Sequence, residues 1–100
     1  MGISPEQVLK IMLFEPKYHP EVARDIAGFP RNIKNRIRKA IEDRLILDPV
    51  RFGEPLRRSL SGLRKLRVGD YRVIYRIQGA AVVILKIGHR KEVYNKFGRT

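Results

Sequence analysis

The stretch LRKLRVGDYRVIYRI, residues 63–77, decides the fold, because two alternating runs flank one tight turn. Glycine at the first central position of the pair Gly69 and Asp70 favours a two-residue type II′ hairpin turn. Residues directly opposite in such a hairpin share a face, and successive residues alternate between faces. One face is mostly apolar, and we expect it to pack against helices. The predicted register pairs Val68 with Tyr71, Arg67 with Arg72, Leu66 with Val73, Lys65 with Ile74, Arg64 with Tyr75 and Leu63 with Arg76.

The other face of this predicted hairpin is basic and carries Lys65, Arg67, Arg72 and Arg76. Arg67 and Arg72 are expected directly opposite each other, where like charges destabilise a ladder unless an anion or carboxylate lies between them. One interpretation is that these side chains turn into water or that one of them pairs with Asp70. The other is a phosphate-binding site, because the guanidinium fork binds phosphate oxygens in a bidentate manner.

Two helices are predicted before the hairpin. The first begins near Pro20, since proline suits the first helical position, and ends at Gly28. The second has an apolar stripe of helical period over residues 33–45, and Asp48 and Pro49 are expected to close it. We expect the two helices to form a hairpin that packs on a sheet. The residues of the second apolar stripe are Ile33, Ile37, Ala40, Ile41 and Leu45.

The two ends of the chain complete the fold. An apolar segment at residues 8–14 predicts a strand that Pro16 ends, after a loose leader at residues 1–7. Residues 81–87 predict a buried central strand that Gly88 breaks, before a short tail. Residues 1–100 are therefore expected to form one α+β domain of order β-α-α-β-β-β. It has an N-terminal strand, a helical hairpin, an antiparallel three-stranded meander and a C-terminal tail.

Composition narrows the class of function. The 100 residues include 22 Lys and Arg against 10 Asp and Glu, for a net charge of +12, which indicates a polyanionic or acidic partner. Cysteine is absent, which excludes a disulfide framework, a thiolate metal site and a cysteine nucleophile. No apolar run is long enough to cross a membrane, and no signal peptide pattern opens the chain. We expect a cytoplasmic protein without a metal or cofactor.

Two motifs resemble one known family. The segment LSGLRKLRVGDYRVIY, residues 60–75, looks like the strand hairpin of the RelE/ParE toxin superfamily. The segment GHRKEVY, residues 88–94, resembles the closing motif of RelE-type toxins. The β-α-α-β-β-β order is also similar to that fold, and the resemblance covers residues 9–97. It implies the toxin of a type II toxin–antitoxin system that cleaves mRNA on the ribosome by attack of a 2′-hydroxyl, without metal.

The resemblance also implies roles for single residues. Lys65 matches one of two strand lysines, and Arg72 matches the arginine that follows the hairpin turn. Arg90 matches the proposed general acid, and Tyr94 matches the proposed general base. The second strand lysine is replaced here by Leu63, and His89 has no counterpart in RelE, although some related toxins use histidines near this point. The expected catalytic residues are Lys65, Arg72, His89, Arg90 and Tyr94; the expected nucleic-acid-binding residues are Arg57, Arg58, Lys65, Arg67, Arg72 and Lys91.

Two alternatives remain open at the level of the sequence. A ParE-like toxin would poison DNA gyrase and cleave no RNA, although the pair Arg90 and Tyr94 argues mildly against it. A non-catalytic nucleic-acid-binding domain fits the charge equally well. Under either toxin reading an acidic antitoxin is the expected partner, with a helix or strand over the basic face. The ribosome and mRNA are further expected partners of a RelE-type toxin.

Overall fold

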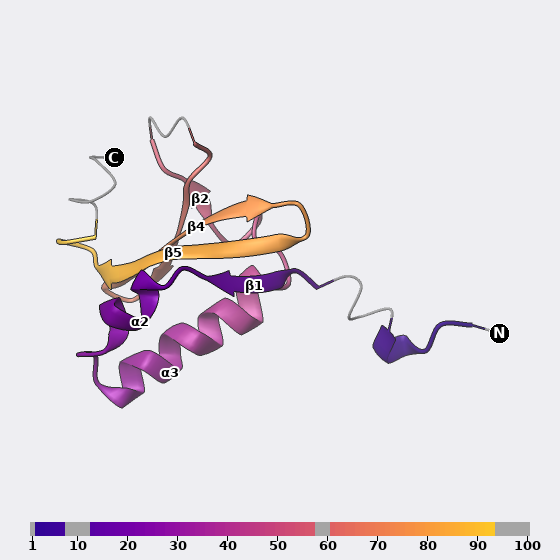
Figure 1. Ribbon diagram of the computed structural model, residues 1–100, viewed down its shortest axis with the longest axis horizontal. Helices are drawn as coiled ribbons and strands as arrows, with labels where there is room; N and C mark the ends of the chain where they lie inside the picture. Colours follow the sequence, from indigo (N-terminus) through magenta and orange to yellow (C-terminus); the bar gives the residue numbers. More distant parts are fainter. Residues whose placement is uncertain (1, 8–12, 58–60, 94–100) are drawn as a thin grey trace.

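The computed structural model describes residues 2–7, 13–57 and 61–93 and has the predicted α+β architecture. Its sheet has five strands in the order β1-β5-β4-β3-β2, and helices α2 and α3 lie on one face of the sheet (Figure 1). The elements are β1 (Glu15–Tyr18), α2 (Glu21–Ile26), α3 (Arg31–Ala40), the π-helical turn η1 (Ile41–Leu45), β2 (Glu54–Pro55), β3 (Arg64–Val68), β4 (Tyr71–Gln78) and β5 (Ala81–His89).

Strands β3 and β4 pair in the register that their turn predicts. Gly69 has a φ of +60°, which glycine adopts without steric cost. The predicted pair of Leu63 and Arg76 lies beyond the ladder, because β3 begins at Arg64. The other five predicted pairs are confirmed, namely Val68–Tyr71, Arg67–Arg72, Leu66–Val73, Lys65–Ile74 and Arg64–Tyr75.

Strand β5 lies between β1 and β4, so it is the interior strand that the sequence predicts. The prediction that Gly88 breaks this strand is wrong, because β5 continues to His89. Gly88 stays in the ladder opposite Arg72. A Cβ atom at Gly88 would lie 3.3 Å from the Cβ of Val93. Glycine at this position therefore permits the close approach of the tail and does not end the strand.

The described N-terminal strand lies later in the chain than predicted. Most of the segment at residues 8–14 lies outside the described residues, and β1 contains Pro16, which was expected to end a strand. Proline is tolerated here because β1 is an edge strand and needs hydrogen bonds on one side only. β1 runs parallel to β5, with Glu15 opposite Ala81 and Tyr18 opposite Ile84.

The main core lies between the sheet and α3, on what we call the inner face. Four helical positions predicted from the apolar period, Ile37, Ala40, Ile41 and Leu45, are buried there. They pack against strand residues such as Tyr75, which is completely buried. Full burial of one isoleucine, leucine or valine side chain of this core contributes roughly 1.5–3 kcal/mol to stability. The strand residues of this core are Leu66, Val68, Val73, Tyr75, Val82, Ile84 and Ile87.

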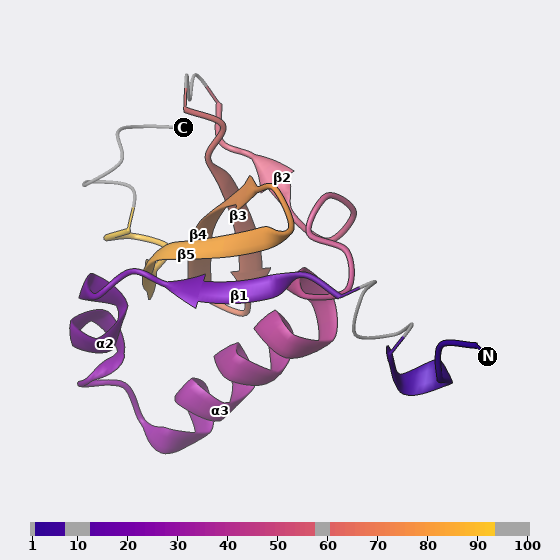
Figure 2. The same ribbon diagram turned by 45° about the vertical axis from the view of Figure 1, so that its right-hand side comes forward.

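The two helices follow each other as predicted but diverge along the sheet. α3 runs below the sheet while α2 packs on β5 past the end of β1 (Figure 2). There the Asp25 carboxylate accepts a hydrogen bond that a neighbouring strand would otherwise accept from β5, since its Oδ2 accepts the Ile87 N–H at 3.0 Å. Its Oδ1 pairs with the Lys86 Nζ at 2.6 Å. These contacts satisfy an otherwise open sheet edge.

The opposite side of the sheet, the outer face, has a smaller apolar cluster. Leu56, Ile74 and Val93 are buried together, and Leu63 packs against them. Within the predicted loop at residues 50–61, the two-residue strand β2 pairs with β3 directly before Leu56. Val93, the last described residue, therefore covers the outer face of β4.

The start of the chain also differs from the predicted loose leader, because residues 5–7 are helical. The Gln7 N–H donates to the Ser4 Oγ at 3.3 Å, and the Ser4 N–H donates to the Gln7 Oε1 at 3.1 Å. This reciprocal capping box explains the helical turn. Within the described residues, no helix is both long enough and apolar enough to span a bilayer.

Candidate nucleic-acid interface

The outer face of β3 and β4 carries the predicted cations. Lys65 and Arg67 project from β3, and Arg72 and Arg76 project from β4, because Arg67 pairs directly with Arg72 in the ladder. The Glu54 Oε1 lies 3.8 Å from the Lys65 Nζ and 3.6 Å from the Arg67 Nε. A carboxylate from β2 therefore neutralises part of the positive charge of β3. It does not lie between Arg67 and Arg72, whose side chains are kept apart by the contacts of Arg72 described next.

Arg72 turns away from Arg67 toward the hairpin turn. Its Nη1 donates to the carbonyl oxygens of Gly69 and Tyr71, both at 2.9 Å. Arg72 is only 8% exposed. All ten Asp and Glu residues lie in the described part of the chain, and none of them forms an ion pair with Arg72 there. A buried guanidinium without a carboxylate is costly, so this position favours an anion.

Arg76 adds a second unsatisfied group to the same face. Its Nε is buried and has no hydrogen-bond partner in the part of the chain that the structure describes. A buried donor without an acceptor costs roughly 1–3 kcal/mol. Arg72 and Arg76, which lie on either side of the buried Ile74 on β4, thus both lack a carboxylate partner in the described chain. Phosphate oxygens would supply the missing acceptors for both.

The end of the sheet at the hairpin turn brings Arg90 close to Asp70. The Arg90 N–H donates to the Asp70 carbonyl oxygen at 2.8 Å, and the Arg90 Nε lies 3.9 Å from the Asp70 Oδ1. The Arg90 side chain is about half exposed. Asp70 therefore pairs with Arg90 and not with Arg67 or Arg72. This contact fixes the start of the tail beside the turn that binds Arg72.

The loop before β2 is fixed by a buried tyrosine. The Tyr75 hydroxyl donates to the Pro49 carbonyl oxygen at 2.6 Å. Arg64 donates from its Nη2 to the carbonyl oxygens of Val50 and Gly53, at 2.9 and 3.1 Å. Burial raises the pKa of Tyr75, while the hydrogen bond from Arg64 opposes this shift. The hydroxyl therefore stays protonated and holds the loop that presents Glu54.

His89 lies on the other side of the sheet from Arg72. It pairs with Tyr71, and the two rings meet edge to face with centroids 5.7 Å apart. Tyr71 in turn contacts Phe29 at 4.9 Å. The His89 Nδ1 accepts the Lys91 N–H at 3.2 Å. His89 thus lines a cleft of about 330 Å³ at the end of β5, with Asp25, Lys86 and Glu92 among its walls.

The remaining predicted residues are spread more widely. Arg57 and Lys91 are exposed, after β2 and in the tail respectively. Tyr94 and Arg58 lie outside the described residues. The structure thus brings Lys65, Arg67 and Arg72 together on one face, with Arg90 at the end of that face.

A basic cleft beside β3 was not predicted from the sequence. Arg67 lines this cleft of about 220 Å³ together with residues of α3 and η1. The available signal was the charge of α3, whose ten residues include five cations and no carboxylate. The cations of the cleft besides Arg67 are Arg36, Lys39 and Arg44. In the described part of the chain, no group of three or more His, Cys, Asp or Glu side chains has the geometry to hold a metal ion.

Comparisons with known proteins agree with the fold. A family model described as the ParE toxin of the type II toxin-antitoxin system parDE matches residues 17–94. Toxin RelG of Mycobacterium tuberculosis is 33% identical over 87 residues, which cover 85% of this chain and 100% of that toxin. Toxin RelE of the same organism is 38% identical over 74 residues, 72% of this chain and 76% of that toxin.

Solved structures show the same relationship. The RelBE2 toxin-antitoxin complex from Mycobacterium tuberculosis matches with a TM-score of 0.72 and 34% identity, over 78% of this chain and 99% of that chain. The archaeal RelE-RelB complex from Pyrococcus horikoshii matches with a TM-score of 0.64 and 28% identity, over 80% of this chain and 98% of that chain. The sequence, the hairpin register and these relatives lead to one assignment: the chain belongs to the RelE/ParE superfamily, the toxins of type II toxin–antitoxin systems.

Proposed function

We propose that this toxin is a ribosome-dependent endoribonuclease that cleaves mRNA without a metal ion. The observation that carries the proposal concerns two β4 arginines, Arg72 and Arg76. Arg72 is buried, the Nε of Arg76 is buried without a hydrogen-bond partner, and neither arginine has a carboxylate partner in the described chain. An RNA phosphate would supply the anion that these two arginines lack. The kinship with toxins named RelG and RelE supports the same substrate.

The proposed reaction is an internal transesterification. The 2′-oxygen of a ribose attacks the adjacent phosphorus, and the bond from phosphorus to the 5′-oxygen of the next nucleotide breaks. The 2′-hydroxyl proton goes to a general base, and a general acid returns a proton to the leaving 5′-oxygen. The products are a 2′,3′-cyclic phosphate and a 5′-hydroxyl. Neither an oxidant nor a co-substrate is needed.

The cations of the outer face would stabilise the extra negative charge of the pentacoordinate phosphorane. Arg72 suits this role, because two carbonyl contacts fix its Nη1 and leave its Nη2 and Nε donors for phosphate oxygens. Lys65 and Arg67 project from the same face and would contact a phosphate that displaces the Glu54 carboxylate. Loss of one such fixed donor typically costs roughly 3 kcal/mol of transition-state stabilisation.

Proton transfer is assigned to the tail. Arg90, beside the hairpin turn, is the proposed general acid, and Tyr94 is the proposed general base. Nearby cations favour tyrosinate and lower the pKa of a tyrosine, which makes a base of a group that normally titrates near 10. His89 is the competing candidate, since histidine is the side chain that most often acts as a general base. Its side chain lies across the sheet from Arg72, which favours Tyr94 over His89.

The biological setting follows from this chemistry. In-line attack requires a splayed RNA backbone, and the ribosome supplies that geometry, so free RNA is expected to be a poor substrate. The substrate would be mRNA on the ribosome, which places the toxin in the cytoplasm. An acidic antitoxin would neutralise it, as the toxin–antitoxin complexes among its structural relatives suggest.

One observation favours a second function. The family model that covers most of the chain is named for the ParE toxin, and a ParE-like toxin would act on DNA gyrase instead of mRNA. Induction of the toxin in growing cells separates the two, with labelled amino acid and labelled thymidine as readouts. We expect translation to stop before DNA synthesis. Early loss of DNA synthesis with normal translation would support the gyrase function and contradict the ribonuclease.

A further inference from the structure

A basic groove runs along the open edge of β3. Strand β2 pairs only with Arg64 and Lys65, so residues 66–68 of β3 have no strand partner on that side in the described chain. Two clefts of about 320 and 220 Å³ adjoin there, because Arg44 and Arg67 line both of them. Together the two clefts form one surface between β3 on one side and α3 and η1 on the other, which we call the edge groove.

The half of the edge groove beside α3 is lined by cations. Arg36 and Lys39 are three residues apart, so α3 presents both on one side. Gly69 of the hairpin turn closes this half, and a Cβ atom there would lie 2.9 Å from the Arg36 Nη1. Asp43 also lines this half, yet Arg36, Lys39 and Arg44 form no ion pair in the part of the chain that the structure describes. This half therefore carries a net positive charge.

The other half of the edge groove ends at an aromatic ring. Phe52 lines this half and is 41% exposed, and the Arg51 guanidinium lies over its ring, 5.5 Å from the centroid. The loop that carries Phe52 is fixed. The Gly53 carbonyl oxygen accepts a hydrogen bond from the Arg64 Nη2, and a Cβ atom at Gly53 would collide with the Tyr75 hydroxyl. The ring is therefore held at the surface before any ligand binds, which lowers the entropic cost of binding.

Cations next to an exposed aromatic ring suit a single-stranded nucleic acid. Phosphates pair with the cations, and an unstacked base lies on the ring. A double helix offers no unstacked base to Phe52, since its bases are stacked on one another. An acidic protein segment would neutralise the cations, but it would not need an aromatic ring held at the surface. The combination of Phe52 with Arg36, Lys39 and Arg44 therefore favours single-stranded RNA.

We propose that the edge groove binds the mRNA segment 3′ of the cleaved phosphate, with a base stacked on Phe52 and phosphates at Arg36, Lys39 and Arg44. This inference rests on the proposed function, because Arg67 belongs both to the outer face and to the edge groove. A strand whose cleaved phosphate lies on the outer face would thus continue past Arg67 into the groove. On a translating ribosome the preceding codon is paired with tRNA, so the strand 3′ of the cut is the one left for the groove.

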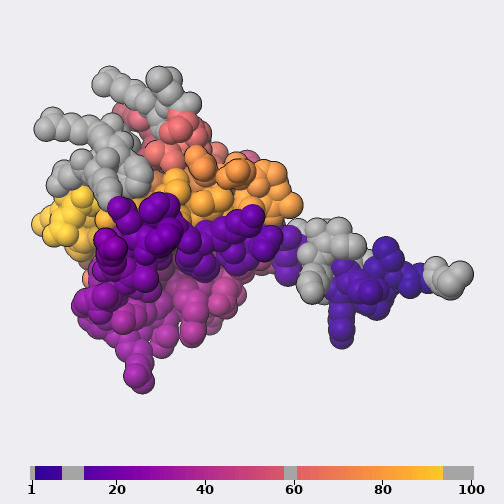
Figure 3. All heavy atoms as spheres, viewed as in Figure 1, coloured from indigo at the N-terminus to yellow at the C-terminus, as the bar shows by residue number. Residues whose placement is uncertain are grey.

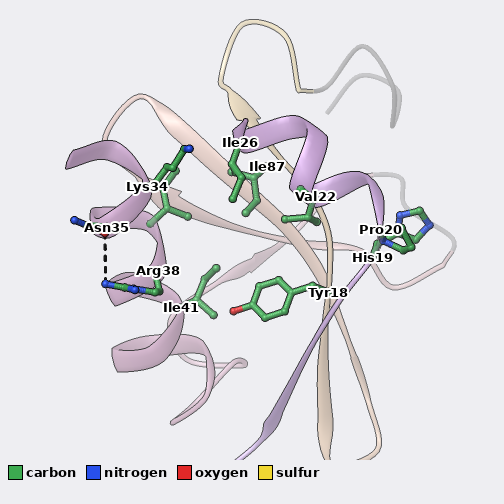
Figure 4. A pocket seen from close by; sticks show the side chains of 12 residues that line it. Tyr18, His19, Pro20, Val22, Ile26, Lys34, Asn35, Arg38, Ile41 and Ile87 are labelled. Atoms are coloured by element: carbon green, nitrogen blue, oxygen red, sulfur yellow. Dashed lines mark hydrogen bonds between the residues drawn. The ribbon is translucent and has the colours of Figure 1, made fainter. Parts of the chain in front are cut away.

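Two pairs of exposed positions make a matched test. Tyr18, 51% exposed, is the aromatic control for Phe52, because it belongs to β1 at the opposite edge of the sheet from β2. Figure 3 shows β1 at the surface, and Figure 4 shows the Tyr18 ring beside the apolar pocket between α2 and α3. Arg31 is the charge control for Arg44, because it is also exposed and lines neither half of the edge groove.

The variants are Phe52→Leu with its control Tyr18→Leu, and Arg44→Gln with its control Arg31→Gln. Each control makes the same chemical change as its partner, except that a tyrosine also loses a hydroxyl. Thermal unfolding of the full-length proteins checks that all four variants fold. The probes are a labelled single-stranded RNA of about 12 nucleotides and a strand with the same sugar-phosphate backbone but no bases. Fluorescence anisotropy measures the affinity for each probe.

Phe52→Leu should weaken binding of the RNA about 5- to 30-fold and leave binding of the strand without bases unchanged, because it removes only base stacking. Arg44→Gln should weaken binding of both strands about 3- to 10-fold at low salt and lower the logarithmic salt slope by about 0.7. Tyr18→Leu and Arg31→Gln should bind nearly like the unmutated chain. Unchanged RNA affinity in Phe52→Leu and Arg44→Gln would overturn the proposal and favour an acidic protein as the occupant of the groove.

Cleavage on ribosomes identifies which RNA fills the groove. One mRNA extends beyond the ribosome-bound codon, and a second ends directly after it. On the long mRNA, Phe52→Leu should raise the toxin concentration for half-maximal single-turnover cleavage about 5- to 30-fold and change the maximal rate less than about twofold. On the short mRNA, the unmutated chain and Phe52→Leu should need the same concentration. A difference that persists on the short mRNA would overturn the proposal and indicate ribosomal RNA as the ligand of Phe52.

The two assays separate this inference from the proposed function. If mRNA on ribosomes stays intact while Phe52→Leu and Arg44→Gln bind RNA less tightly than their controls, the ribonuclease proposal fails and the edge groove stands as an RNA-binding site. If Phe52→Leu and Arg44→Gln cleave the long mRNA like the unmutated chain at every toxin concentration, the groove proposal fails and the ribonuclease proposal stands.

Discussion

Replacement of Glu54 by glutamine tests whether the outer face binds phosphate. In the free protein the Glu54 carboxylate lies 3.8 Å from the Lys65 Nζ and 3.6 Å from the Arg67 Nε. In the proposed site, a phosphate would take the position of this carboxylate. Glu54→Gln keeps the shape of the side chain and removes its charge. If the proposed site is correct, this variant binds RNA more tightly than the unmutated chain.

The size of the effect follows from the exposure of the pair. Glu54 is 54% exposed and Arg67 is 68% exposed, so solvent screens both contacts. Such ion pairs are each worth roughly 0.2–1 kcal/mol, and RNA no longer has to displace two of them. The expected gain is about 2- to 30-fold in affinity. The salt dependence should steepen by up to about 1.4 in logarithmic slope, since each phosphate neutralised on a single strand contributes about 0.7.

The assay is fluorescence anisotropy of a labelled single-stranded RNA over a series of KCl concentrations. Glu15→Gln is the matched control, because it removes the same charge from β1, at the opposite edge of the sheet from β2. The control should change affinity only slightly, through net charge. Equal affinities and slopes for Glu54→Gln, Glu15→Gln and the unmutated chain would refute the assignment of Lys65 and Arg67 as phosphate contacts.

Three further substitutions test the fold and the chemistry. Tyr75→Phe should lower the free energy of unfolding by about 1–3 kcal/mol, because it orphans a buried carbonyl acceptor. Burial raises the pKa of Tyr75, so the contribution of its hydroxyl to stability is complete below the unfolded value near 10 and is lost as the pH rises through the folded value. Chemical denaturation at a series of pH values above about 10 should therefore show a larger loss of stability for the unmutated chain than for Tyr75→Phe. Asp25→Ala should cost about 3–5 kcal/mol in a denaturant melt, because Lys86 then loses a partner that is 7% exposed; an unchanged midpoint would exclude a structural role for the pair. Tyr94→Phe should slow single-turnover cleavage on programmed ribosomes roughly 10²- to 10⁴-fold while ribosome binding persists, whereas loss of cleavage in His89→Ala with a normal rate in Tyr94→Phe would reverse the assignment of the base.

The hairpin was predictable because its determinants are local. The turn at Gly69 sets the parity of every residue in β3 and β4, and the alternating pattern then assigns each side chain to a face. The helix over Ile33 to Leu45 was predictable for a similar reason, since one apolar stripe of helical period has to meet the sheet. The π-helical geometry of its last turn, where the Ile46 N–H donates to the Ile41 carbonyl oxygen, left no mark in that pattern.

The edges of the sheet were less predictable, because their pairing depends on distant residues. β1 contains Pro16, which local rules place outside a strand, and only its position at the edge of the sheet makes it acceptable. β2 is two residues long and carries no periodic signal of its own. Its position depends on Tyr75 and Arg64, which bind the preceding loop from another part of the sequence.

The candidate site was predictable in composition and less so in environment. The alternation along the strands predicted that Lys65, Arg67 and Arg72 share one face. It did not predict the burial of Arg72 or its hydrogen bonds to the carbonyl oxygens of the turn. The Glu54 counter-charge was also missed, because it comes from β2. The face on which His89 lies follows from its partner Tyr71, which faces the core. That pairing depends on the register of β5, which the hairpin turn at Gly69 does not set.

The central claim is that this toxin cleaves mRNA on the ribosome. The most direct measurement maps the ends of a defined mRNA after purified toxin is added to ribosomes programmed with it. The account predicts a cut within the ribosome-bound codon, with a 2′,3′-cyclic phosphate and a 5′-hydroxyl as new ends, and little cleavage of the same RNA without ribosomes. Intact mRNA on ribosomes, together with inhibition of DNA gyrase supercoiling by the same preparation, would contradict it.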